Sequence, residues 1–92
     1  MPNVLKVGSY YIYFWTEENN EPVHVHISKG KPSTDSTKIW LTKNRGAVVS
    51  NNKSRIPQHE LNKLLEIIED QHFFICRKWQ EMFGLETLKF YC

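Results

Sequence analysis

Residues 23–28, with the sequence VHVHIS, alternate aliphatic and polar side chains over six positions. Successive side chains of a strand point to opposite faces, so this alternation predicts a β-strand with one apolar and one polar side. The apolar set is Val23, Val25 and Ile27, and the polar set is His24, His26 and Ser28. A sheet built around this strand should bury the first set in a core and carry the two histidines on its other face.

Further segments on both sides of this stretch also have strand character. Residues 10–16 (YYIYFWT) precede it, and residues 38–42 (KIWLT) and 47–50 (AVVS) follow it. All are rich in the β-branched and aromatic residues that favour strands, and polar segments containing Asn, Gly or Pro separate them. The pattern predicts an antiparallel meander from about residue 4 to about residue 50, in which residues 4–7 could form a fifth strand.

The pattern changes at Pro57, whose fixed φ suits the first turn of a helix. Apolar residues then recur at the i, i+3, i+4, i+7 spacing of one helical face, and a second stripe over residues 71–83 ends at Gly84. The stripes are Leu61, Leu64, Leu65 and Ile68, then Ile75, Cys76, Trp79, Met82 and Phe83. We expect two helices within about residues 57–83, and a short strand or docked extension over residues 85–92.

Strands first and helices second predict an α+β fold: a mainly antiparallel sheet of four to five strands, followed by two helices packed on one face. The 92 residues suit a single domain, residues 1–92. The predicted core contains Ile12, Phe14, Val25, Ile27, Ile39 and Leu41 from the sheet and Leu61, Leu64, Leu65, Ile68, Ile75 and Trp79 from the helices. Leu65→Ala should lower the free energy of unfolding by about 2–5 kcal/mol if Leu65 is fully buried.

Composition narrows the functional classes. Twelve basic and ten acidic residues give a net charge of +2, too small for a chain held to nucleic acid chiefly by phosphate neutralisation. The longest apolar run has six residues, whereas a membrane-spanning helix needs about twenty. The two cysteines are too few for a disulfide framework, and no basic-then-apolar leader is seen. We therefore expect a cytoplasmic protein without a membrane partner.

The polar side of the predicted sheet is rich in aromatic and basic residues. The predicted binding surface consists of Tyr11, Tyr13, Trp15, His24, His26, Lys38 and Trp40. Tyr and Trp provide large contact areas, so the surface suits a protein partner or a second copy of this chain. A nucleic acid is an alternative, because bases stack on aromatic rings. A third alternative is that residues 85–92 or the loop at residues 29–37 simply cover this face.

His24 and His26 are spaced so that two imidazoles on one strand face could chelate a metal. A zinc site needs at least a third ligand, and the candidates lie in loops or in helices assigned to the opposite face. These candidates are Glu21, Asp35, His59, His72 and Cys76. We expect no metal and no cofactor, and interpret the histidines as hydrogen-bonding surface or interface groups.

Catalytic motifs are scarce in this sequence. It has no nucleophile elbow, no Gly-rich phosphate loop and no paired metal-carboxylate motif. The enzymatic alternative is a small metal-independent ribonuclease in which His24 and His26 serve as general base and acid. Lys38 or Arg55 would then stabilise the charge of the phosphorane-like transition state. The sequence does not decide between such an enzyme and a non-catalytic module.

Three motifs, taken in order, resemble a known family. They are Asn20-Glu21-Pro22-x-His24-x-His26 after an aromatic strand, Lys38-x-Trp40-Leu41, and a second helix in which Trp79 precedes Phe83-Gly84. This arrangement resembles the small bacterial proteins grouped as domain of unknown function 4160, over nearly the whole chain. That family usually has Pro-Pro before the first histidine, where this sequence has Pro22-Val23.

The resemblance implies a small α+β fold and membership of two-gene, toxin–antitoxin-like modules, but it brings no established reaction. It also favours one functional surface for His24, His26 and Trp40. We therefore expect a small intracellular bacterial protein that acts as a protein-interaction module. The alternative is a ribonuclease or nucleic-acid-binding protein that uses His24 and His26.

Overall fold

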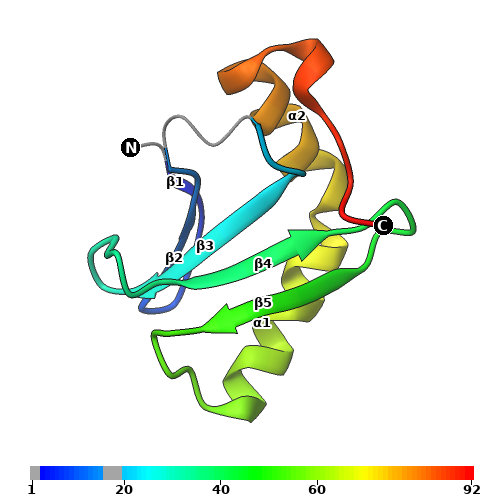
Figure 1. Cartoon of the computed structure of the whole chain (residues 1–92). Helices are drawn as coiled ribbons and strands as arrows, with labels where there is room; N and C mark the ends of the chain where they lie inside the picture. The colour runs from blue at the N-terminus through cyan, green and yellow to red at the C-terminus, as the bar shows by residue number, and fades with distance from the viewer. Residues whose placement is uncertain (1–2, 16–19) are drawn as a thin grey trace.

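The computed structural model describes residues 3–15 and 20–92 as one antiparallel sheet with two helices on one side of it (Figure 1). The strands pair in chain order, so the sheet is a meander with β1 and β5 at its edges. The elements are β1 Asn3–Val7, β2 Tyr10–Tyr13, β3 His24–Lys29, β4 Thr37–Leu41, β5 Ala47–Asn52, α1 Gln58–Asp70, α2 His72–Phe83 and the short 3₁₀ helix η1 Leu85–Thr87. The predicted α+β class is confirmed, including the fifth strand.

The strand boundaries differ only slightly from those predicted. The strand expected over residues 10–16 ends at Tyr13, where pairing with β3 stops. Thr16 and the first part of the predicted turn, residues 17–19, lie outside the described residues. The last strand continues two residues further than expected, to Asn52, because Asn51 and Asn52 pair with β4 beyond a register shift.

Helix ends follow the local signals. Pro57, with φ −56°, directly precedes α1, and Gly84, with φ +108°, ends α2 in a conformation that other residues rarely adopt. Only Gln71 separates the two helices, and its backbone N–H still donates to the carbonyl oxygen of Ile67 at 2.9 Å. The helices therefore follow one another as an almost continuous column behind the sheet (Figure 1).

The core lies between the helices and the sheet, and its membership is close to that predicted. The buried apolar residues include Ile12, Phe14, Val25, Ile27, Ile39 and Leu41 from the sheet side and Leu61, Leu64, Ile68, Ile75 and Trp79 from the helices. Leu65 is the exception: it is only partly buried, at the margin of this cluster. Leu65 thus packs against the core without the full burial on which the 2–5 kcal/mol cost depended, because α1 turns Leu61, Leu64 and Ile68 toward the sheet.

The C-terminal tail docks as an extension. The Val23 N–H donates to the Lys89 carbonyl (2.7 Å), the Tyr91 N–H to the Leu41 carbonyl (3.1 Å), and the Lys43 N–H to the Cys92 carbonyl (2.9 Å). These bonds hold the tail against the start of β3 and the end of β4, so that it runs back to the turn between β4 and β5 (Figure 1). The tail thereby reaches the face that the helices leave uncovered.

Candidate functional site

The face of the sheet opposite the helices carries most of the residues singled out in the sequence. In β4, Ile39 and Leu41 belong to the core, so Lys38 and Trp40 point to the other side. His26 pairs with Lys38 across the strands, and His24 pairs with Trp40. We call this side the helix-free face.

Beneath the surface of this face lies a hydrogen-bonded aromatic layer. Tyr13 is fully buried, and its hydroxyl shares a hydrogen bond with the Ser28 hydroxyl at 2.8 Å. The loop between β3 and β4 covers it, since the Ser33 N–H donates to the Tyr13 hydroxyl at 3.1 Å. The His26 ring stacks on Tyr13, with ring centroids 5.8 Å apart, and shares a 2.9 Å hydrogen bond with the Ser36 hydroxyl. Tyr13 and most of His26 therefore lie in a buried layer beneath the exposed residues of the helix-free face.

His24 is also buried, with no exposed area. Its ring centroid lies 5.1 Å from that of His26, 5.3 Å from that of Trp40 and 5.4 Å from that of Trp79 on α2. Its Nδ1 hydrogen-bonds to the Pro22 carbonyl at 2.8 Å. The histidines lie side by side near Trp40, but His24 is buried and is not a group at the surface of the chain. At the start of β3 the Trp79 ring of α2 lies against the His24 ring and contributes to this burial.

A polar hollow of about 310 Å³ opens above this buried layer. We call it the His26 hollow, and its lining residues are Trp15, His26, Thr34, Ser36, Lys38, Asn51 and Lys53. They come from four separate places: the segment after β2, strand β3, the loop before β4, and the paired strands β4 and β5 with the residue that follows β5. Of the four catalytic candidates, the hollow brings together only His26 and Lys38.

Lys38 occupies the middle of the helix-free face. Its ammonium group lies 2.6 Å from a carboxylate oxygen of Glu21 and 4.2 Å from the centroid of the Trp40 ring. The ion pair and the cation–π contact fix this side chain between the hollow on one side and Trp40 on the other. Lys38 therefore borders both features.

Beyond Lys38, an aromatic patch stands on the surface. The Tyr91 ring lies parallel to the Trp40 ring, with centroids 5.1 Å apart and planes 11° from parallel. Tyr91 is 50% exposed, and Val48, which pairs with Trp40 across the strands, is 39% exposed. We call Trp40, Tyr91 and Val48 the aromatic patch.

Tyr91 was not predicted as a site residue, although the sequence holds a signal for it. That signal is the alternation of the tail. Leu88 and Phe90 pack against the core, so Lys89 and Tyr91, which alternate with them, point away from it. Asn51, Lys53, Thr34 and Ser36 of the hollow were missed as well. No local pattern marks them, because the register shift in β5 and the path of the loop bring them together.

Two predicted residues lie apart from this constellation. Tyr11 is partly buried, contacts the ammonium group of Lys6, and borders another shallow hollow with Gly30, Lys31 and Pro32. Arg55 is exposed after β5, with φ +56°, and does not line the His26 hollow. The predicted surface is thus divided, and only part of it faces a common space.

No group of three metal-ligating side chains forms within residues 3–15 and 20–92. His72 and Cys76 do meet on α2, with Nε2 and Sγ 3.7 Å apart, but both are buried and no third ligand joins them. Burial, and secondarily the nearby Arg45, lowers the pKa of His72, while burial raises the pKa of Cys76 to about 11. Cys76 therefore stays a protonated thiol near neutral pH, as suits a core residue.

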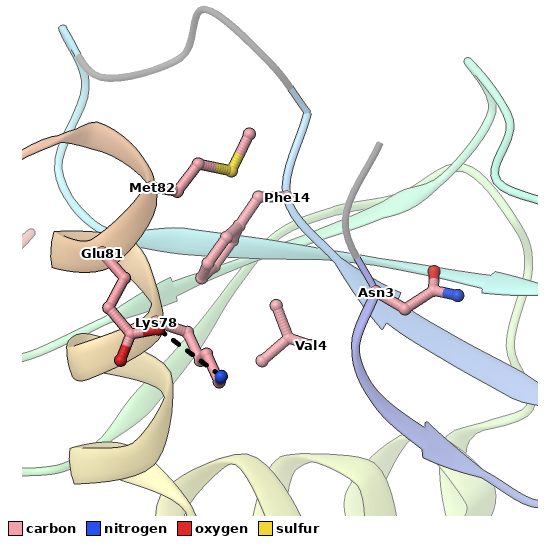
Figure 2. A pocket seen from close by; sticks show the side chains of 6 residues that line it. All are labelled: Asn3, Val4, Phe14, Lys78, Glu81 and Met82. Carbon is pink, nitrogen blue, oxygen red and sulfur yellow. Dashed lines mark hydrogen bonds and ion pairs between the residues drawn. The ribbon is translucent and has the colours of Figure 1, made fainter.

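A second hollow, of about 320 Å³, lies between β1 and α2, away from the histidines. Figure 2 shows Phe14, Val4 and Met82 around it, with the Lys78–Glu81 ion pair of 3.5 Å at its rim. Its walls are mainly hydrocarbon, and its paired charges neutralise each other. It contributes no reactive group.

None of the helices in the described part of the chain is long and apolar enough to cross a membrane.

Residues 9–80 match the model of a family described as domain of unknown function (DUF4160). The match spans β2 to most of α2 and includes both histidines, Lys38 and Trp40. No curated protein and no solved structure matches the chain.

Proposed function

We propose that this chain, which belongs to the DUF4160 family, is a protein-interaction module that binds its partner through the aromatic patch. The observation that carries the proposal is the parallel stack of Trp40 and half-exposed Tyr91 on the helix-free face. The family resemblance adds the context, a bacterial two-gene system of the toxin–antitoxin-like kind.

The chemistry of the patch suits a protein interface. Trp and Tyr supply large, rigid contact areas, and they are enriched among the residues that contribute most to binding free energy. Lys38 at its margin provides a polar rim, as is common around the apolar centre of an interface. A stacked pair also loses little side-chain freedom when a partner covers it, because each ring already restrains the other.

The neighbouring sheet edge supports the same proposal. β5 is the last strand of the sheet, and both Val48 and Val49 on it are more than one-third exposed. An edge strand presents backbone groups that a partner strand can pair with, and its side chains then give specificity. A partner that covers Tyr91 and Val48 therefore has a backbone edge within reach.

The ribonuclease alternative has less support from the geometry. General acid–base catalysis requires two groups that can both reach the scissile phosphate. His24 has no exposed area, its Nδ1 bonds to the Pro22 carbonyl, and Arg55 lies outside the His26 hollow. We therefore assign no catalytic role to the two histidines.

The test is co-expression with the product of the adjacent gene, followed by sedimentation of the chain alone and of the mixture. Trp40→Ala and Tyr91→Ala should each weaken association, Trp40→Ala by about 2 kcal/mol or more. Phe73→Ala is the matched control, because Phe73 is a 68% exposed aromatic residue on α2. Sedimentation distinguishes a complex with the neighbour from self-association.

Two results would overturn the proposal. One is a strict monomer at high concentration that retains no neighbouring gene product. The other is a complex that tolerates Trp40→Ala and Tyr91→Ala but weakens on Phe73→Ala, since the interface would then lie on the helical side.

A further inference from the structure

The His26 hollow differs from the aromatic patch in its chemistry. Among the residues that the structure describes, its polar lining comprises two ammonium groups (Lys38 and Lys53), an imidazole (His26), two hydroxyls (Thr34 and Ser36), one amide (Asn51) and no carboxylate. Ammonium, hydroxyl and amide groups all donate hydrogen bonds, and the ammonium groups add positive charge. Such a set of donors is complementary to an oxyanion.

Lys53 and Asn51 leave donors available to a ligand. Lys53 forms no ion pair with any residue in the described part of the chain. The side-chain oxygen of Asn51 accepts a 3.3 Å hydrogen bond from the backbone N–H of Lys53. The NH₂ group of the Asn51 side chain therefore remains as a donor. Ser36 is 5% exposed and is held by its hydrogen bond with His26. The hollow thus combines a hydrogen-bonded floor with an exposed cation at its rim.

An aromatic wall completes the hollow. The Trp15 ring stands edge-on to Tyr13 and His26, with centroid distances of 5.5 Å and 6.0 Å, and remains partly exposed. An indole beside a group of cationic donors can stack a planar base while the donors bind the attached phosphate. A simple inorganic anion would leave this wall unused.

The charge distribution of the chain favours the same ligand. Residues 1–56, which contain the sheet, carry eight lysines and arginines against four acidic residues. Residues 57–92, which contain the helices, carry four against six. Although the whole chain has a net charge of only +2, residues 1–56 are positively charged and residues 57–92 are negatively charged. The field of the positive part attracts anions toward the sheet.

We propose that the His26 hollow binds a nucleoside phosphate unit, free or within a single strand, with the phosphate on Lys53, Ser36 and Asn51 and the base on Trp15. Glu21 modulates this site, because its carboxylate pairs with Lys38 at 2.6 Å and competes with an incoming anion for the same ammonium group. Removal of the Glu21 charge should therefore tighten binding, an effect that a purely structural ion pair would not produce.

The probes are uridine 5′-monophosphate, inorganic phosphate and hexauridylate, titrated calorimetrically into the full chain at low salt. The uridine nucleotide should bind more tightly than inorganic phosphate, and Trp15→Leu should remove that advantage. Lys53→Gln should weaken nucleotide binding about five- to tenfold, because a charge-assisted hydrogen bond is lost. Glu21→Gln should tighten binding about two- to fivefold.

Lys63→Gln is the matched control, since it removes the same charge from the exposed surface of α1 and should leave binding unchanged. If hexauridylate binds more tightly than the mononucleotide and with a steeper salt dependence, the ligand is a single strand. If hexauridylate and the mononucleotide bind equally, the ligand is a free nucleotide. The proposal is overturned if no nucleotide binds at up to about 1 mM. It is also overturned if inorganic phosphate binds as tightly as the nucleotide, or if Lys63→Gln weakens binding as much as Lys53→Gln.

Discussion

The two faces of the sheet are covered in different ways. On one face, α1 and α2 bury a continuous apolar cluster that includes Trp79, Ile75 and Leu64. On the other, the described part of the chain provides an irregular loop and the C-terminal tail as cover, and these contact polar and aromatic groups through Ser33, Ser36 and Tyr91. Both faces are supplied by the same alternating strands.

This difference indicates where ligands and partners can act. Two amphipathic helices exclude water from most of a sheet face, because each presents a stripe of apolar side chains that packs against the strands, and here the hollow between β1 and α2 is left at the margin. A loop and a tail cover less area than two helices. They therefore leave the His26 hollow open and the aromatic patch, to which the tail contributes Tyr91, exposed. The helix-covered face therefore supplies stability, and the helix-free face supplies the candidate binding sites.

The largest effect expected from this comparison separates two tryptophans. Trp79→Ala should lower the free energy of unfolding by about 3–5 kcal/mol, because Trp79 is fully buried between Phe14 and Phe83. Trp40→Ala should cost only about 1–2 kcal/mol, because Trp40 is partly exposed under Tyr91. Urea denaturation of both variants measures the difference. Equal costs would mean that the helix-free face is a second core.

A smaller contrast lies within one helix. Leu64→Ala should cost about 2–5 kcal/mol, since Leu64 is only 2% exposed, whereas Leu65→Ala should cost about 1 kcal/mol. Both substitutions replace Leu by Ala within the same helix, so the change in helix propensity is the same and cancels from the difference between their unfolding free energies. Thermal or urea unfolding gives both values. A larger loss for Leu65 than for Leu64 would contradict the rotation of α1 described above.

The smallest effect concerns the tail that bridges both faces. His72 is 3% exposed and stacks on Phe90 of the tail, with ring centroids 5.6 Å apart. Burial lowers its pKa from 6.5, so below about pH 6.5 the unfolded chain takes up a proton that the folded chain resists. The free energy of unfolding should therefore fall as the pH drops through this region, because the unfolded state binds more protons.

Denaturation of wild type and His72→Leu between pH 7.5 and pH 5 tests this dependence. The substitution should reduce the pH-linked loss of stability, and His59→Leu, at an exposed position at the start of α1, is the control. An unchanged loss in His72→Leu would show that His72 is not sealed beneath the tail.

Much of the fold was predictable, because it depends on local periodicity. The period of two in VHVHIS assigned Val25 and Ile27 to the core, and the helical spacing of Leu61, Leu64 and Ile68 did the same for α1. Pro57 and Gly84 also marked helix ends correctly, since their backbone preferences are intrinsic to the residues.

Burial on the helix-free face was not predictable in the same way. The alternation assigned His24 and His26 to one side of β3, but it carries no information on what covers that side. The cover comes from Ser36 in a loop, Trp79 on α2 and the tail, all remote in sequence from one or both histidines. Leu65 shows the same limit on a helix, where its stripe position did not reveal that it lies at the core margin.

The sequence by itself determined the order of the elements, the sides of β2, β3 and β4 that enter the core, and the family motifs. These properties follow from backbone preferences and from the periods of strand and helix, which act over a few residues. Only the tertiary structure decided that Tyr91 stacks on Trp40, that Lys53 and Asn51 meet Ser36, and that His24 is closed off by Trp79. These contacts depend on the strand register and on the paths of a loop and a tail, which are fixed by the packing of the whole chain.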